Sequence, residues 1–293
     1  MKTFGFLLAS LLAVLNCRAV VVFSDNFNRA DSSTVGNGWT ETSTGTGNAE
    51  IASSQLQIDN GGTAGRTYIS QDTTTFGAGY ASQLDQNSGT VTWTFNMHTT
   101  RTTELSGFGS GSYGIAFVLA TSSSDFLTGS GYAVVWGQNP GTDPDPLRLV
   151  RYTAGLVVAG STITDVITGS GSPFGDMSTE FLSVRVTYNP SDDMWSLAAR
   201  DDAGSFADPS SGSLTALGTA ADSTYTAGSL DYMGALWNYN TTAGQSADFD
   251  NLLIDVIPEP GFYGAAGAAF LLGVAALHAF RRRNQNAKAG TAP

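Results

Sequence analysis

Catalytic chemistry in this chain would have to rely on very few side chains. The only cysteine is Cys17, and His98 is the only histidine between residues 20 and 257. A zinc site normally needs several His or Cys ligands, and a Ser-His-Asp triad would depend on His98 alone. No serine stands in a Gly-x-Ser-x-Gly motif. We therefore predict no catalytic residues and expect His98 at the surface or at a sheet edge.

Carboxylates are the other resource for catalysis. A retaining glycosidase needs two carboxyl groups about 5 Å apart, and a Glu-x-Asp-x-Glu strand would place them on one face. The glutamates between residues 20 and 257 fall outside any such pattern; they are Glu41, Glu50, Glu104 and Glu180. The sequence thus disfavours a glycan-cleaving enzyme.

Aspartate makes up 20 of the 25 acidic residues, often in turn-like segments such as Asp192-Asp193 and Asp201-Asp202. Calcium binds roughly six to eight oxygen ligands, which carboxylates and loop carbonyls can supply. These turns therefore make Ca²⁺ a candidate cofactor. The alternative is that aspartate only forms turns and solubilises the surface. No segment has EF-hand spacing.

Two segments place an aromatic side chain beside amides, which is a combination suited to sugar binding. One contains Trp136 and Asn139, and the other contains Trp237, Asn238 and Tyr239. An exposed ring can stack on the C–H face of a sugar while amides bond to its hydroxyls. The alternative is that these large aromatic side chains fill a core.

The segments that must position these residues have the pattern of β-strands. Residues 90–97 alternate apolar and polar side chains, and residues 181–200 predict a hairpin with its turn at 189–193. Residues 113–120 and 131–136 are apolar on both faces, which predicts strands inside a packed sandwich. Further strands are expected at 20–27, 49–58, 66–70, 147–152, 230–239 and 247–257, with a long loop at 201–228. We predict an all-β, antiparallel β-sandwich.

The N-terminal segment 1–19 has the features of a secretory signal peptide. Lys2 precedes a short apolar run at 4–15, and the segment ends in small residues. We predict cleavage after Ala19. The alternative is a lipoprotein acylated at Cys17, although Asn16 before it is a poor fit.

The C-terminal segment combines three signals in order. Pro258, Glu259 and Pro260 form a rigid link, residues 261–280 are largely apolar, and an arginine cluster follows. About 20 apolar residues can cross a bilayer as one transmembrane helix. Arginines remain on the cytoplasmic side, which would leave the body outside the membrane. Residues 284–293 would form a short cytoplasmic tail. The alternative is a buried helix.

The body between these ends, residues 20–257, is strongly acidic. Of the 25 acidic residues, only Glu259 lies outside the body, so the body contains 24. Of the 13 basic residues, six lie at the two ends, so the body contains seven, all of them arginines. The body therefore has a charge of about −17, which would repel nucleic acid phosphates. Nucleic acid is excluded as a partner.

The C-terminal segment 258–283 resembles the PEP-CTERM sorting signal. The resemblance rests on Pro258-Glu259-Pro260, the single apolar span and Arg281-Arg282-Arg283. It implies processing near the PEP motif by an exosortase, with release or reattachment of the body at the cell surface. It also implies a connection with exopolysaccharide. His278 within the span and the ten residues after the arginines depart from the usual pattern.

The body is similar to the concanavalin A-like/laminin G-like jelly rolls. The opening segment 23–31 with Gly38-Trp39, the central strands at 114–120 and 131–137, and the closing segment 249–255 carry the resemblance. Terminal strands of such folds lie side by side, which implies that Asp25 approaches Asp248 or Asp250. These three residues are the candidate calcium ligands. No sugar-binding motif transfers.

Together these features predict an exported, non-catalytic protein of the cell surface or extracellular matrix that binds polysaccharide. It would be anchored first in the inner membrane through 261–280, with its body outside the cytoplasm, and then processed by the exosortase. The alternatives are a glycan-active hydrolase or lyase on the same fold and a purely structural surface protein.

Overall fold

The computed structural model describes residues 18–137, 145–157, 162–169 and 179–258. Residues 19–257 form one compact unit. Residues 1–18 and 258–293 form a second unit, of which only Arg18 and Pro258 are described. The predicted signal peptide core and the predicted membrane span at 261–280 lie outside the described residues. Within those described ranges, no helix is long and apolar enough to span a membrane.

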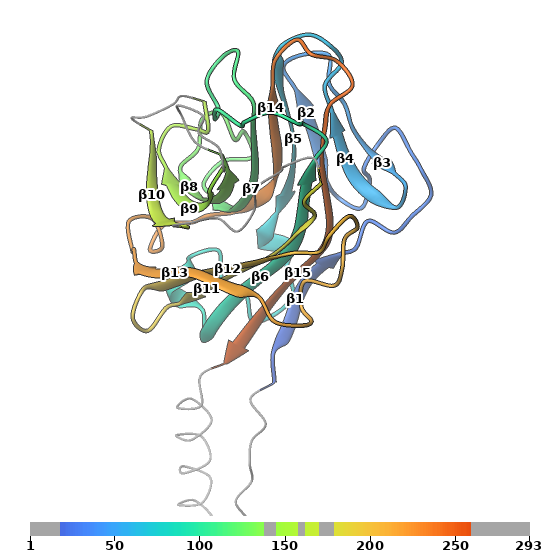
Figure 1. The fold of residues 1–293 in the computed structure, drawn as a ribbon. Helices are drawn as coiled ribbons and strands as arrows, with labels where there is room; N and C mark the ends of the chain where they lie inside the picture. The colour runs from blue at the N-terminus through green and yellow to red at the C-terminus, as the bar shows by residue number, and fades with distance from the viewer. Residues whose placement is uncertain (1–17, 138–144, 158–161, 170–178, 259–293) are drawn as a thin grey trace, which may run out of the picture. The chain divides into compact units, whose positions relative to one another are not determined.

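The described residues form two antiparallel sheets that pack face to face (Figure 1). The first sheet has the order β13-β12-β11-β6-β15-β4-β3, and β1 also pairs with β15. Its strands are β1 (Val20–Asp25), β3 (Ala49–Ala52), β4 (Gln55–Asp59), β6 (Gly89–Thr99), β11 (Leu182–Asn189), β12 (Met194–Asp201), β13 (Thr215–Ala221) and β15 (Ser246–Pro258).

The second sheet has the order β10-β9-β8-β7-β14-β5-β2. Its strands are β2 (Thr40–Ser43), β5 (Gly65–Asp72), β7 (Gly114–Thr121), β8 (Gly131–Trp136), β9 (Leu147–Tyr152), β10 (Ile163–Thr168) and β14 (Tyr232–Tyr239). Two short 3₁₀ helices, Thr73–Thr75 and Leu84–Gln86, lie between β5 and β6. The predicted antiparallel β-sandwich is confirmed.

The main core lies between the two sheets and uses alternate residues of each strand. On β6 these are Val91, Trp93, Phe95 and Met97, as the alternating sequence predicts. Phe95 stacks on Phe117 of the opposite sheet, with ring centroids 4.2 Å apart. This contact fixes the two layers against each other.

A second core covers the outer face of the seven-stranded sheet. The alternate residues Ala116, Val118 and Leu236 pack there against Phe108 and Phe126 from the connecting loops. Strands buried on both faces need apolar residues at every position, which accounts for the continuous apolar runs at 113–120 and 131–136.

The strand predictions fail mainly at the sheet edges. Residues 201–228 were expected to form a loop but contain β13, and β2 and β10 were not predicted; all three are edge strands. An edge strand needs only backbone pairing on one side, so its sequence need not alternate. The single strand expected at 49–58 is a hairpin, because Ser53 and Ser54 have φ of 54° and 61° and reverse the chain.

Candidate functional site

The site begins where β15 changes its pairing partner. Along one edge, β15 pairs first with β4, through Ser246–Phe249, and then with β1, through Leu252–Val256. Asp250 and Asn251 lie between these two pairings. Asn251 has a φ of 49°, in the left-handed region that asparagine tolerates better than most residues. The local irregularity interrupts the sheet surface at this position.

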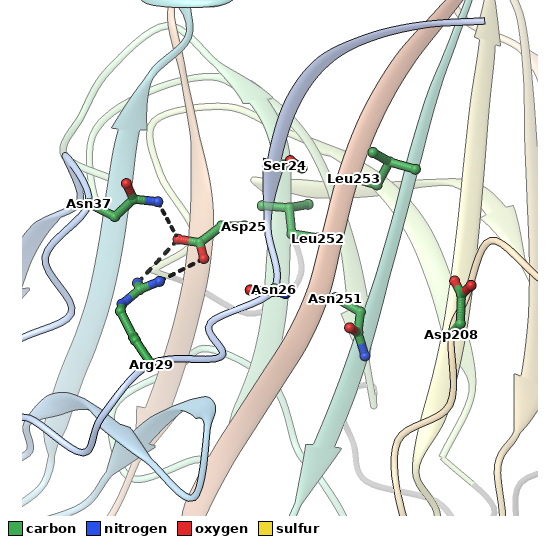
Figure 2. Close-up of a pocket in the computed structure, with 9 residues that line it drawn as sticks. All are labelled: Ser24, Asp25, Asn26, Arg29, Asn37, Asp208, Asn251, Leu252 and Leu253. Carbon is green, nitrogen blue, oxygen red and sulfur yellow. Dashed lines mark hydrogen bonds and ion pairs between the residues drawn. The ribbon is translucent and has the colours of Figure 1, made fainter.

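A pocket of about 690 Å³ opens beside this irregularity (Figure 2). It lies over the end of β1, the middle of β15 and the loop between β12 and β13. Its lining residues are Ser24, Asp25, Asn26, Arg29, Asn37, Asp208, Asn251, Leu252 and Leu253. The wall therefore combines amides, carboxylates, a guanidinium and a hydroxyl with the Leu253 side chain, while the Leu252 side chain is buried in the core.

Asp25 is the structural centre of one wall. Its carboxylate accepts a hydrogen bond from the Phe27 backbone N–H at 2.8 Å and from Trp39 Nε1 at 2.9 Å. Arg29 donates to both oxygens, at 2.7 and 3.2 Å, and Asn37 Nδ2 donates at 3.0 Å. The Asp25 side chain is only 2% exposed. One buried carboxylate thus holds the whole 26–39 loop against the sheet (Figure 2).

The pKa values of the Asp25 and Asp250 carboxyl groups are shifted in opposite directions. Burial alone would raise the pKa of Asp25, but the donors Arg29, Asn37, Trp39 and Phe27 together hold its pKa below the usual value. Burial raises the pKa of Asp250 to about 6; the N–H of Asn251 opposes this rise, and the negative charge of Asp25 adds to it. The two groups are therefore electrostatic neighbours.

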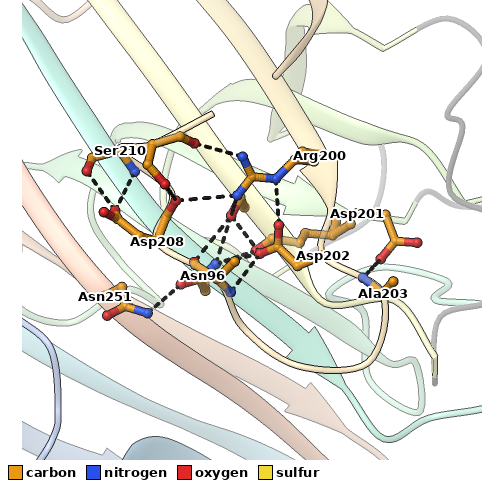
Figure 3. Close-up of polar contacts among 12 residues, drawn as sticks. Asn96, Arg200, Asp201, Asp202, Ala203, Asp208, Ser210 and Asn251 are labelled. Atoms are coloured by element: carbon orange, nitrogen blue, oxygen red, sulfur yellow. Dashed lines mark hydrogen bonds and ion pairs between the residues drawn. The ribbon is translucent and has the colours of Figure 1, made fainter. Parts of the chain in front are cut away.

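The opposite wall is a loop that a buried polar network holds on the outer face of the sheet (Figure 3). The Asp202 side chain, 0% exposed, pairs with Arg200 Nε at 2.7 Å. Its other oxygen accepts from Ser183 Oγ, Asn96 Nδ2 and the Ala207 N–H. Arg200 also donates to the carbonyl of Asp208. The network thereby fixes the backbone at Asp208, whose side chain lines the pocket.

Asn251 joins the pocket to the network that holds the Asp208 loop. Its Nδ2 donates to Asn96 Oδ1 at 2.9 Å and to Asp250 Oδ2 at 3.3 Å. Asn96 in turn donates to Ser183 and Asp202 (Figure 3). A continuous hydrogen-bonded path therefore runs from the pocket into the network below the loop, which makes the site preorganised.

The predicted calcium site at Asp25, Asp248 and Asp250 is not assembled. Asp248 bonds instead to His98 Nδ1 at 2.9 Å and to Gln57 Nε2 at 3.2 Å. The oxygens of Asp25 already accept five hydrogen bonds from protein donors. Their lone pairs are therefore occupied and are not available to coordinate a cation. In the part of the chain that the structure describes, no three acidic, His or Cys side chains are grouped to hold a metal ion.

The predicted sugar-stacking residues belong to the core, which corrects that expectation. Trp136 and Trp237 are 0% exposed, so neither ring offers a face to a ligand. Asn238 donates to the carbonyls of Gly107 and Ser112, and the Tyr239 hydroxyl accepts from the Gly47 N–H. These side chains hold loops in place. Asn139 lies outside the described residues.

His98 is buried rather than exposed, contrary to expectation. Its ring is stacked on Phe181 with centroids 4.0 Å apart, and it bonds to Asp248. The outer face of β6 is covered here because the loop after β12 places Phe206 near the same rings. The strand pattern showed that His98 pointed away from the main core but could not show this cover.

Most residues of the pocket were not predicted from the sequence. Asp25 is a predicted site residue only as a calcium ligand, and the rest of segment 23–31 carries only the fold resemblance, although its dense run of Asp, Asn and Arg forms one wall. Asp208 and Asn251 lie far away in sequence and gave no signal. Only folding brings these three segments together.

Comparisons with known proteins support the fold. No protein-family model matches the sequence, and no curated protein does. Among solved structures, the CBM2 module of the evolved Dit of Lactobacillus casei BL23 phage J-1 is 12% identical with a TM-score of 0.51, covering 82% of this chain and 97% of that one. The seed lectin of Lotus tetragonolobus is 10% identical with a TM-score of 0.50, covering 81% of this chain and all of that one. The fold is a lectin-like jelly-roll sandwich.

Proposed function

We propose that this protein binds polysaccharide without cleaving it, and that the pocket over β1 and β15 is its saccharide site. The observation that carries the proposal is the pocket itself, in which Asn37 and Asn251 are held by buried networks. Amide, carboxylate and hydroxyl groups are suitable partners for sugar hydroxyls. Leu253 adds apolar contact. A volume of about 690 Å³ is within the usual range for small-molecule sites.

The shared fold is consistent with this proposal. A seed lectin uses the same arrangement of sheets, although the low identity restricts the likeness to architecture. We therefore attribute the proposed binding to the pocket of this chain.

A glycan-cleaving enzyme is the rival reading, and the opposed pKa shifts of Asp25 and Asp250 are the observation in its favour. Such a divergence is typical of an acid–base pair. However, both oxygens of Asp25 are occupied by donors from the protein, including the Arg29 guanidinium. A nucleophile or base needs a free lone pair directed at substrate. We therefore assign Asp25 a structural role.

Ser24→Tyr is expected to reduce saccharide binding at least tenfold. Ser24 is exposed on β1 and lines the pocket, so a tyrosine there would occupy the pocket without disturbing the core. Binding of the purified protein to a panel of oligosaccharides, measured by isothermal titration calorimetry, checks this result. Thr164→Tyr, at an exposed position of β10, is the matched control.

Two outcomes would contradict the proposal. If no neutral, acidic or amine-bearing oligosaccharide binds, the purely structural alternative holds. If Ser24→Tyr and Thr164→Tyr bind equally well, the site lies elsewhere. Release of reducing sugar or of an unsaturated product during the titrations would support the enzyme instead.

We further propose that the chain is exported, anchored through 261–280 and sorted by an exosortase to the cell surface or matrix. The support is the order of Pro258-Glu259-Pro260, the apolar span and the arginine cluster. Val20 pairs with Val256, so the start of the first strand, β1, lies beside the end of the last strand, β15. The segments for export and anchoring are thus joined to neighbouring strand ends.

Processing is expected to yield a body that lacks 261–293 and is found outside the inner membrane. Fractionation of cells followed by mass spectrometry of the C-terminal peptide measures this. A variant with Pro258, Glu259 and Pro260 replaced by alanine should remain at full length in the membrane. Wild-type protein that also stays intact in cells with an active exosortase would overturn the sorting proposal.

A further inference from the structure

The hydrogen bonds around the pocket decide which atoms of its amides face a ligand. Asn37 Nδ2 donates to Asp25, and Asn251 Nδ2 donates to Asn96 and Asp250. Both NH₂ groups are therefore turned into the protein, which leaves the two amide oxygens for a ligand. Asn26 is the exception, because its oxygen accepts from the Asn28 N–H and its NH₂ group remains available.

The carboxylate of Asp208 adds a third acceptor on the opposite wall. Its Oδ1 accepts from the Ser210 hydroxyl at 2.6 Å and from the Ser210 N–H at 2.8 Å. These two bonds orient the group and leave Oδ2 for a ligand. They also lower the pKa of Asp208, assisted by the charge of Arg200, so the group is ionised at neutral pH.

The charge at the pocket is negative as well. Arg29 is paired with Asp25, and Arg200 is paired with Asp202. Among the described residues around the site, Asp208 and Asp250 are then the carboxylates that no arginine pairs with directly. An acidic saccharide would meet like charge here, while a protonated amine would meet the ionised carboxylate of Asp208, whose Oδ2 is open to a ligand.

We propose that the pocket prefers a saccharide unit that carries a protonated primary amine over neutral and acidic sugar units. This inference rests on the proposed saccharide site and names the class of ligand. The ammonium group donates a hydrogen bond to Asp208 Oδ2, and hydroxyl groups along the saccharide donate to the amide oxygens of Asn251 and Asn37. Saccharide hydroxyl groups near the amine form hydrogen bonds with the Asn26 NH₂ group and the Ser24 hydroxyl. Uronic acids lack the required donor and are repelled.

The test compares a β-linked glucosamine oligosaccharide, its fully N-acetylated counterpart and a galacturonic acid oligosaccharide. Titrations use low ionic strength and a mildly acidic buffer in which the amines are protonated. Asp208 is exposed, so each charge contributes modestly, and we expect the amine form to bind about three- to tenfold tighter than the acetylated form. Added salt should reduce this preference.

Asp208→Asn should remove the preference while the acetylated oligosaccharide still binds. Asp192→Asn is the matched control, because Asp192 is also exposed, also accepts from the N–H two residues ahead, and lies at the other end of the β11–β12 hairpin. It also separates pocket binding from attraction to the acidic surface as a whole.

The outcomes distinguish this inference from the proposed function. Equal binding of the amine and acetylated forms, tighter binding of the acid, or equal loss in Asp192→Asn and Asp208→Asn would overturn the inference and leave the saccharide site intact. If none of the three probes binds, both fail.

Discussion

Replacing Asp25 with alanine is expected to reduce the free energy of unfolding by about 3 kcal/mol. The carboxylate is buried and accepts five hydrogen bonds, including those from Arg29 and the Trp39 indole. Its removal leaves a partly buried guanidinium and several donors without an acceptor, which costs more than the lost bonds alone. Urea unfolding followed by tryptophan fluorescence measures the change.

The effect of Asp25→Ala should depend on pH in a defined direction. The pKa of Asp25 is lower in the folded protein than in the unfolded chain. Its contribution to stability is therefore complete above the unfolded pKa, about 4, and is lost as the pH falls through the lower folded value. The difference between wild type and variant should shrink in strong acid.

Asp31→Ala provides the control for this experiment. Asp31 is exposed and accepts one hydrogen bond, from the Ser53 N–H. We expect a change below about 1 kcal/mol. If the two variants lose similar amounts of unfolding free energy, the hydrogen bonds around Asp25 stabilise the fold no more than one surface hydrogen bond does. The structural role assigned to Asp25 would then be wrong.

Trp237→Ala is expected to lower the free energy of unfolding by about 3–5 kcal/mol. Trp237 is fully buried on β14, between Thr67 of β5 and Ile115 of β7, and contacts the Tyr113 ring. Alanine would leave a large cavity between the sheets. Thermal and urea unfolding, each followed by circular dichroism, measure the loss.

Trp237→Phe separates packing from ligand binding. Trp237 Nε1 is buried and has no hydrogen-bond partner among the described residues, so phenylalanine loses volume but no hydrogen bond. We expect a smaller loss of stability and unchanged saccharide binding. A folded Trp237→Phe protein that no longer binds sugar would restore this residue to the binding site and contradict its assignment to the core.

The positions of the central strands could be predicted because burial imposes a pattern on them. Residues 90–97 alternate since β6 is packed against the other sheet, and 131–136 are apolar throughout since β8 is covered on both faces. The edge strands β2, β10 and β13 could not be predicted because few of their side chains are buried, so burial imposes little pattern on their sequences. Trp136 and Trp237 were read both as core and as sugar ligands, and a local pattern cannot separate these roles.

Charge, composition and strand periodicity are local properties, so the amino-acid sequence is enough to predict an acidic, cysteine-poor β-sandwich body with few catalytic options. The roles of Asp25 and Asp248, in contrast, depend on contacts that form only in the folded chain. Their partners Trp39 and His98 are 14 and 150 residues away, and the fold turns both carboxylates to protein donors instead of a calcium ion. The pocket likewise exists only where β1, β15 and the loop bearing Asp208 meet, since hydrogen bonds across distant segments orient its amides.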